Sequence, residues 1–346
     1  MKRASPTLIE LTETIYDLET EDGAWMPSLL EVALPLFDMD LGIATAAYSR
    51  DASGFTMHQR LSCGGPPDFL ARSSRAVSEW PPEVFAALMR PGIVATLSEL
   101  IPDHPQCLDA YRREMDGCED VLGMTAVDPN GLGILLIAIL PKVTTLRGSQ
   151  RNRWKMIGAH LAAGHRLRRA VVAELESGAL PHRAEAVIDP NNFTITDAVG
   201  DAATNNAAEA LREAAVQLDR ARGSLRKSDP TAALETWKSL TDGRWSLVDW
   251  FDSDDRRFVL ALPNAPEVTD PRGLSERENL VATYTIHGDS GKLIGYRLGI
   301  STTSVSTALH RAMQKLGVKT RTQLVERFSA FETPPTPASP SGQSAS

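Results

Sequence analysis

Two scarcities in this 346-residue chain, of cysteine and of long apolar runs, each exclude a class of protein. Cys63, Cys107 and Cys118 are odd in number and lack CxxC spacing, so we expect free buried thiols rather than disulfides or a zinc site. The longest apolar run, Ile134 to Leu140, is far shorter than the roughly 20 residues that cross a bilayer. The N-terminal segment turns acidic before any apolar core appears, so we expect no secretory signal. These absences predict a cytoplasmic protein without a membrane segment.

The composition indicates a globular chain whose charge is unevenly distributed. Hydrophobic residues make up 42% and charged residues 23% of the sequence, which suits two or three folded domains. The net charge is −8, but residues 272–328 contain nine Lys and Arg against four Asp and Glu, a net +5. The remainder of the chain therefore carries −13. A basic C-terminal module on an acidic body confines the attraction for nucleic acid to one end.

Residues 1–176 alternate between helical and β-rich stretches. A tight hairpin is expected at Asp128-Pro129-Asn130-Gly131, because Asn-Gly supplies the positive φ that such turns require. We expect helices over 8–20, 26–38, 68–80, 82–90, 106–116 and 147–176, and strands over 41–49, 54–62, 93–97, 120–127 and 132–140.

This element order resembles that of a GAF-type sensor domain, in which an antiparallel sheet lies under a ligand pocket. The resemblance implies a sensory or dimerisation domain over 1–176 that passes its signal through the last helix. The alternative is an α+β domain that only dimerises.

The pattern over residues 177–262 predicts a smaller α+β unit that loosely resembles a PAS domain. Its three tryptophans, Trp237, Trp245 and Trp250, are expected to fill the core. Residues 263–271 contain three prolines and predict a linker, and the Pro-rich tail 331–346 is expected to be disordered. In this unit we expect strands over 184–189, 193–196, 245–251 and 256–262, and a helix over 202–222.

Residues 274–328 carry the start and stop signals of several short helices. Ser275 followed by Glu278 predicts a capping box, and Ser290 predicts a second helix start. Gly299 interrupts the next helical pattern, and Ser301 opens another. The segment after Ser301 places five apolar residues on one face: Val305, Leu309, Ala312, Met313 and Leu316. Two short helices joined by a Gly-containing turn form a helix-turn-helix, whose second helix enters a DNA major groove.

The same run resembles, without a gap, the LuxR-type (GerE-like) helix-turn-helix of transcriptional regulators. The shared motifs are Leu274-Ser275-x-Arg277-Glu278, Gly288-x-Ser290-x-Lys292-x-Ile294, Leu298-Gly299-Ile300-Ser301, Lys315-Leu316-Gly317-Val318 and Arg321-Thr322-Gln323-Leu324. The resemblance implies an all-α four-helix DNA-binding domain over 272–330. Four positions depart from the family: Ala282 and Gly295 are expected to thin the core of this module, Leu293 is expected to pack on the preceding domain, and Ala308 replaces a position often occupied by His.

The resemblance and the local chemistry together point to a set of DNA-contacting residues. A lysine at a helix start suits a phosphate, hydroxyls in the first turn of the reading helix do the same, and the outward positions of that helix face base edges. The DNA-binding residues predicted in this way are Lys292, Thr302, Thr303, Ser304, Ser306, Thr307, His310, Arg311 and Lys315. Because most of these side chains are short, we expect modest intrinsic specificity and a homodimer on two half-sites.

The sequence therefore predicts a sequence-specific DNA-binding transcriptional regulator that binds double-stranded DNA in the major groove. A small-molecule ligand, with unknown binding residues, and RNA polymerase are further candidate partners. We expect no catalytic residues, no metal site, no cofactor and no membrane partner. The N-terminal segment is helical and lacks the strand ending in paired acids with which a receiver domain begins. Trp25, Tyr48 and Trp80 do not form the constellation that binds acyl-homoserine lactones.

Three alternatives stay open at this point. The first is a sigma-factor-like promoter-binding protein, and the second is a body that only binds other proteins. The third is an enzyme body with an appended DNA-binding module. Such an enzyme would draw a thiol–imidazole pair from His58, Cys63, His104, Cys107 and Cys118.

Overall fold

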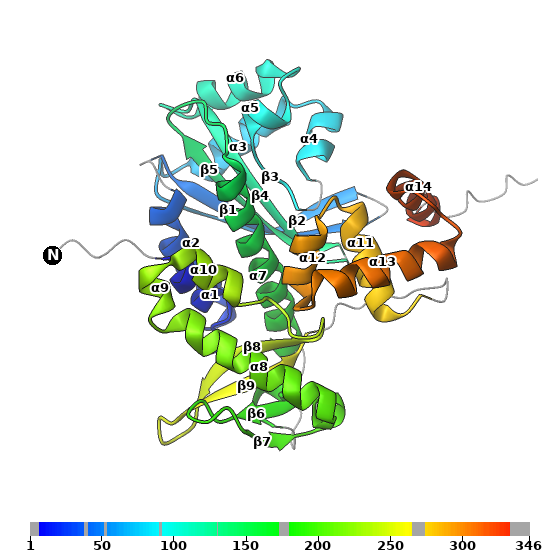
Figure 1. The fold of residues 1–346 in the computed structure, drawn as a ribbon. Coiled ribbons are helices and arrows are strands. Elements are labelled where there is room, and N and C mark those ends of the chain that lie inside the picture. The colour runs from blue at the N-terminus through cyan, green and yellow to red at the C-terminus, as the bar shows by residue number, and fades with distance from the viewer. Residues whose placement is uncertain are drawn as a thin grey trace, which may run out of the picture.

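The central element of the fold is a long helix, α7 (Gly148–Val172), that extends from one antiparallel sheet toward a second one (Figure 1). The structure is a computed structural model that describes residues 7–37, 41–51, 54–89, 92–129, 131–172, 180–264 and 274–332. The predicted apolar stripe of α7 is buried at Ile157, Leu161 and Leu167. Because this stripe packs within one chain, α7 belongs to the core of residues 7–264, which we call the body.

The first sheet has five strands in the described part of the chain, in the antiparallel order β2-β1-β5-β4-β3. β4 and β5 pair from Asp120 opposite Leu140 to Val127 opposite Gly133, as the predicted hairpin requires. Asn130 of its turn lies outside the described residues. The strands are β1 (Ile43–Asp51), β2 (Gly54–Cys63), β3 (Val94–Thr96), β4 (Asp120–Val127) and β5 (Leu132–Leu140).

Helices cover both faces of this sheet. Alternate strand residues point to opposite sides, so Ile134 and Leu136 pack with α1, α2 and α7, whereas Leu135 packs with α3 to α6. The helices are α1 (Leu8–Ile15), α2 (Asp22–Phe37), α3 (Phe69–Ser78), α4 (Pro82–Leu88), α5 (Leu97–Leu100) and α6 (Pro105–Glu114).

The second sheet is smaller and has the antiparallel order β7-β6-β9-β8. Two of the three predicted core tryptophans, Trp237 and Trp245, are buried beside it, and Trp250 packs on Phe258. Its strands are β6 (Ala186–Ile188), β7 (Ile195–Ala198), β8 (Trp245–Phe251) and β9 (Arg257–Pro263). The accompanying helices are η1 (Pro181–Arg183), η2 (Gly200–Ala203), α8 (Asn205–Arg222), α9 (Leu225–Ser228) and α10 (Pro230–Thr236).

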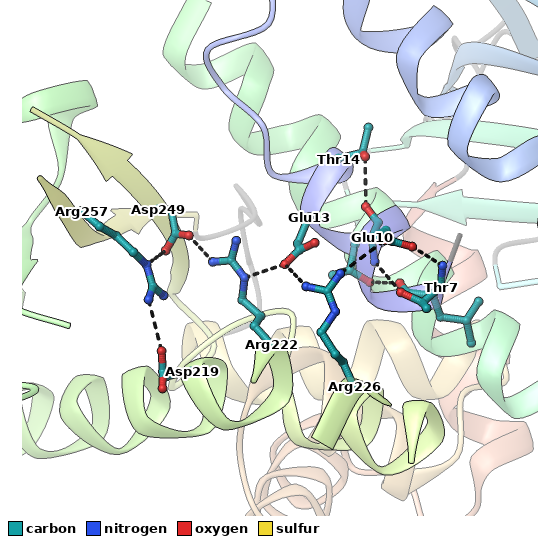
Figure 2. A network of polar contacts seen from close by, with 11 residues as sticks. Thr7, Glu10, Glu13, Thr14, Asp219, Arg222, Arg226, Asp249 and Arg257 are labelled. Atoms are coloured by element: carbon teal, nitrogen blue, oxygen red, sulfur yellow. Dashed lines mark hydrogen bonds and ion pairs between the residues drawn. The ribbon is translucent and has the colours of Figure 1, made fainter. Parts of the chain in front are cut away.

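Ion pairs join α1 to the second sheet (Figure 2). Arg222, at the end of α8, contacts Glu13 of α1 at 2.9 Å and also pairs with Asp249 of β8. Arg257 of β9 contacts Asp249 and Asp219, both at 3.2 Å. Each arginine in this network is therefore matched by carboxylates of neighbouring elements.

The C-terminal module consists of α11 (Glu276–Ile286), α12 (Gly291–Leu298), α13 (Thr302–Leu316) and α14 (Arg321–Glu332). It packs against the body through α12, which contacts α7. Leu293, Ile294 and Leu298 of α12 belong to the same buried cluster as Ile157 of α7. Leu293, which was expected to pack on the body, thus lies in the buried cluster that joins α12 to it. A smaller cluster is internal to the module: Leu274, Ala282, Ala312, Leu316, Leu324 and Phe328.

The predicted α+β class is confirmed, with antiparallel sheets followed by a helical C-terminal module. The helix expected over 8–20 was too long, because α1 ends at Ile15 and Asp17 then accepts hydrogen bonds from the amides of Glu19 and Thr20 in a turn. The sequence also did not predict α5, α9 or α10.

The domain boundaries at 176/177 and 262/263 stay predictions. Of the expected linker 263–271, Pro263 ends β9 and Asn264 is buried, while the rest lies outside the described residues. α14 continues to Glu332, and the remainder of the expected tail also lies outside them.

Candidate nucleic-acid interface

The helix starts of the module are capped as the sequence predicts. Ser275 Oγ accepts from the Glu278 amide at 3.3 Å, and the Glu278 carboxylate accepts from the Ser275 amide at 2.8 Å. Ser290 Oγ accepts from the Leu293 amide at 3.3 Å. Ser301 Oγ accepts from the amide of Ser304 at 3.1 Å. These caps satisfy amides that a helix start leaves free and fix where each helix begins.

The turn between α12 and α13 is closed by two glycines. Gly299 has a φ of +64°, a left-handed conformation in which glycine carries little strain. The Ile300 amide then donates to the Gly295 carbonyl at 3.0 Å. A Cβ on Gly295 would lie 2.8 Å from the Ile300 carbonyl oxygen. The expectation that Gly295 thins the core was therefore wrong, because the backbone of the turn fills the space that a side chain would need.

One face of α13 presents polar side chains to solvent. Val305, Ala308, Ala312 and Leu316 form its buried face. The opposite stripe is exposed and lies at spacings of three and four residues: Thr303, Ser306, Thr307, His310 and Arg311. We call this stripe, together with Thr302, the reading face. In the described part of the chain none of these six side chains has a hydrogen-bond or ion-pair partner.

The remaining predicted residues have partners within the chain. Lys292, in the first turn of α12, is 81% exposed, and its Nζ lies 3.4 Å from the Glu235 carboxylate of the body. Ser304 lies 2.9 Å from Ser301, oxygen to oxygen. Lys315 donates to the Glu278 carboxylate at 2.7 Å, and this hydrogen bond is the main cause that lowers the pKa of Glu278. The structure thus places the nine predicted residues along α13 and at the start of α12.

Not every positive charge of the module faces solvent. Arg297 is buried, and its Nε donates to the buried Asp289 carboxylate at 2.7 Å. Its guanidinium stacks over the Tyr284 ring at 5.1 Å. One of the nine positive charges counted in this segment is therefore paired inside the module instead of facing a partner.

A loop of the body, Ser239–Gly243, caps the end of α12. Ser239 Oγ donates to the Arg297 carbonyl at 2.8 Å, and the Gly243 amide donates to the Leu298 carbonyl at 2.5 Å. A Cβ on Gly299 would lie only 1.8 Å from the Leu240 carbonyl oxygen. The last carbonyls of a helix lack partners within it, so this loop satisfies α12 from outside the module.

A buried chain of polar groups also joins the module to the body. His160 of α7 lies 2.7 Å through Nε2 from the Tyr296 hydroxyl of α12, and 3.1 Å through Nδ1 from the Tyr16 hydroxyl of α1. Tyr296 donates to the Leu234 carbonyl at 2.7 Å. Burial lowers the pKa of His160 to about 3, so its imidazole is neutral near pH 7.

The local sequence around these contacts predicted neither the loop nor the polar chain. The sequence indicated only that Tyr296 would be buried, because it follows two apolar positions on the inner side of α12. Its partners His160 and Leu234 are 136 and 62 positions away in the chain, so no periodicity links them.

The comparison with protein-family models agrees with this geometry. Residues 272–328 match the family model described as "Bacterial regulatory proteins, luxR family". The C-terminal module is a LuxR-type helix-turn-helix domain. The LuxR-type domain makes the chain, in its broad class, a DNA-binding transcription regulator. No curated protein matches the chain. The crystal structure of Escherichia coli SdiA matches at 10% identity over 93% of this chain and 96% of that one, with a TM-score of 0.30.

A cavity of about 300 Å³ lies between the first sheet and α3 to α6. Its lining is mostly apolar, with Trp80 and Phe85 among its aromatic side chains, and none of the described lining residues is acidic. Ser73 and Tyr111 lie 2.9 Å apart, hydroxyl to hydroxyl. Arg60 donates to the Ser74 hydroxyl at 2.6 Å. The cavity thus suits a mainly apolar molecule with few polar groups.

The residues considered for an acyl-homoserine lactone do not meet in this cavity. Trp80 lines it, but Trp25 belongs to α2 on the opposite face of the sheet. The Trp25 ring stacks on His165 with centroids 6.3 Å apart. Tyr48 is buried and lies 4.6 Å from Phe55, centroid to centroid.

The thiols and imidazoles considered for an enzyme are not arranged as pairs. His58 Nε2 lies 2.8 Å from the Ser49 hydroxyl, and His104 Nδ1 lies 3.3 Å from the Gln106 amide nitrogen. Burial raises the pKa of Cys107, and it raises that of Cys118 to about 12, whereas a nucleophilic thiol needs a lowered pKa. Among the described residues no group of three His, Cys, Asp or Glu could hold a metal ion.

None of the described helices is long and apolar enough to span a bilayer.

Proposed function

We propose that this protein is a sequence-specific transcription regulator that inserts α13 into the major groove of double-stranded DNA. The observation that carries the proposal is the reading face, whose hydroxyls, imidazole and guanidinium face solvent without a partner among the described residues. Ser306, Thr307 and His310 would face base edges. Phosphate contacts would come from the residues around them: Lys292, Thr302, Thr303, Ser304, Arg311 and Lys315.

The test is the binding of the full chain to duplex DNA across a salt series, with the double variant Lys292→Ala/Arg311→Ala. Each lost phosphate contact reduces the slope of log affinity against log salt by about 0.9, so this variant should lose about 2 in slope. The matched control is Lys227→Ala/Arg220→Ala, which removes two exposed positive charges from the body. If the slope of the first variant is unchanged, the assignment of α13 as the DNA-binding helix is wrong.

The proposed form on DNA is a homodimer that binds two half-sites. The reading face has only one long side chain, Arg311, so a single copy offers few bidentate base contacts. A duplex with two half-sites one helical turn apart should bind two chains cooperatively, and a single half-site should bind one chain far more weakly. Sedimentation of both complexes measures the stoichiometry. The cytoplasm, where its DNA target lies, is the proposed location, and RNA polymerase is a proposed further partner.

We also propose that the body senses a small, mainly apolar ligand in the cavity next to α3 to α6. The support is an apolar lining with a few polar groups, on a sheet whose other face packs on α7. α7 in turn contacts α12 of the module, so a change at the sheet has a physical path to the reading face.

Mass spectrometry of small molecules retained on the purified chain tests this sensor role. Val77→Trp would fill the cavity and should abolish retention. Val216→Trp, at an exposed site on α8, is the control and should retain the ligand. Equal retention by both variants would place any bound molecule elsewhere.

A further inference from the structure

A groove of about 510 Å³ lies where the body meets the start of α12. On the body side it is lined by Asn152 and Lys155 of α7, Glu235 of α10 and the following Lys238. On the module side it is lined by Ser290 and Lys292. The groove exists only because the module is docked, since its two walls belong to different parts of the chain.

The groove has more positive than negative charge. It contains three lysines and one acid, Glu235, among its described lining residues. The Glu235 carboxylate lies 3.4 Å from Lys292 Nζ, and Lys155 has no hydrogen-bond or ion-pair partner in the described part of the chain. Lys238 donates to the Glu235 main-chain carbonyl at 2.6 Å and lies 4.9 Å over the Tyr296 ring.

Two of the three lysines, Lys238 and Lys292, act on each other across this groove. Burial is the largest cause that lowers the pKa of Lys238; the Glu235 carboxylate raises it, and the charge of Lys292 lowers it further. Like charges facing one groove with a single carboxylate favour an anion between them. A phosphate would relieve this repulsion.

The docked arrangement also leaves the reading face open. The six side chains of the reading face are all exposed while α12 packs on α7. Lys292, a proposed phosphate contact at the start of α12, also lines the groove. A DNA strand carries a phosphate at every nucleotide, so a strand that passes Lys292 has further phosphates on either side.

We propose that the DNA strand that contacts Lys292 continues into this groove, where Lys155 and Lys238 of the body bind further backbone phosphates. The docked form is then the form that binds DNA, and the body contributes directly to affinity. A phosphate there displaces the Glu235 carboxylate from Lys292, so Glu235 competes with DNA. This inference rests on the proposed function, because it needs α13 in the major groove.

Two variants of the full chain test the inference in opposite directions. Lys155→Ala should weaken binding several-fold, equally on a target duplex and on a random one, and reduce the salt slope by about 0.9. Glu235→Gln should strengthen binding at low salt, because a competing carboxylate is removed. Lys142→Ala, at another exposed lysine of the body, is the control and should behave as the unaltered protein.

The outcomes separate this inference from the function on which it rests. If Lys155→Ala and Glu235→Gln leave affinity and slope unchanged while Lys292→Ala/Arg311→Ala lowers both, the inference is wrong and the DNA-binding function stands. If the double variant also has no effect, the function itself fails. Thermal stabilisation by 10 mM inorganic phosphate that Lys155→Ala abolishes, with DNA binding intact, would assign the groove to a free anion and overturn the DNA contact.

Discussion

The body and the C-terminal module use their polar side chains differently. In the body, Arg222 and Arg257 are matched by carboxylates of α1, α8 and β8 (Figure 2). On the reading face, six polar side chains face solvent without a partner among the described residues. A polar group that the fold satisfies contributes to stability, whereas an ordered array that the fold leaves unsatisfied is available to a partner. This difference distinguishes side chains that hold the fold together from side chains that are available to a partner.

The largest effect is expected at the turn between α12 and α13, against which the loop Ser239–Gly243 of the body packs. Gly299→Ala would combine an unfavourable φ with a collision against the Leu240 carbonyl, so we expect a loss of about 3 kcal/mol in the free energy of unfolding. Gly317→Ala is a matched control, because Gly317 has a φ of +68° but no atom within 4 Å of the added Cβ. It should lose about 1 kcal/mol. Equal losses in denaturant titrations would show that the loop of the body does not constrain the turn.

A smaller effect is expected from the ion network. Arg222→Ala leaves the half-buried Glu13 and Asp249 with fewer partners and should cost about 2 kcal/mol of unfolding free energy, with DNA affinity unchanged. Arg256→Ala removes an exposed arginine from Asp252, whose carboxylate still accepts from the amides of residues 254 and 256, and should change the unfolding free energy by less than about 0.5 kcal/mol. A loss of DNA affinity in stably folded Arg222→Ala would contradict the division between the two regions.

The buried His160 makes stability depend on pH. Its folded pKa of about 3 lies below the usual value of 6.5, so the unfolded chain binds more protons between these two values. Stability from this group is therefore complete above pH 6.5 and falls by about 1.4 kcal/mol for each pH unit below it. Urea titrations from pH 7 to 4 should show a steeper decline for the unaltered protein than for His160→Gln. Parallel curves would mean that His160 is not buried in its neutral form.

The smallest effect on stability is expected on the reading face itself. His310→Ala removes an exposed side chain without a partner and should change the unfolding free energy by less than about 0.5 kcal/mol. Its effect should appear as a several-fold loss of preference for the target duplex over a random duplex, measured by competition binding. Lys319→Ala, another exposed position of the module, should keep that preference. A destabilised His310→Ala, or an unchanged preference, would argue that this position does not face DNA.

Local signals predicted much of the fold because they were strong where elements begin and end. β4, β5 and β8 have the predicted bounds, since turn residues flank β-rich runs. The caps at Ser275, Ser290 and Ser301 are also as expected. The same signals, with the family resemblance, were enough to identify the DNA-binding module and to name its exposed residues.

Contacts between distant segments were not predictable in this way. His160 and Tyr296 meet because α7 and α12 pack together, and the sequence gives no register between them. Glu235 lies in α10, a short helix that the sequence did not predict, so its contact with Lys292 could not be foreseen. Gly295 was misjudged for the same reason, because its role depends on where the Ile300 carbonyl lies.

The most direct test of this account is amide hydrogen exchange of the full chain, measured alone and with a duplex selected from a random-sequence pool. The account predicts slower exchange at the start of α12 and over Thr302–Arg311 when DNA is bound. It also predicts continued protection of the amide of Gly243, because the module stays docked. Unchanged exchange along α13 would contradict the assignment of the reading face. Faster exchange at Gly243 on DNA would show that the module leaves the body to bind.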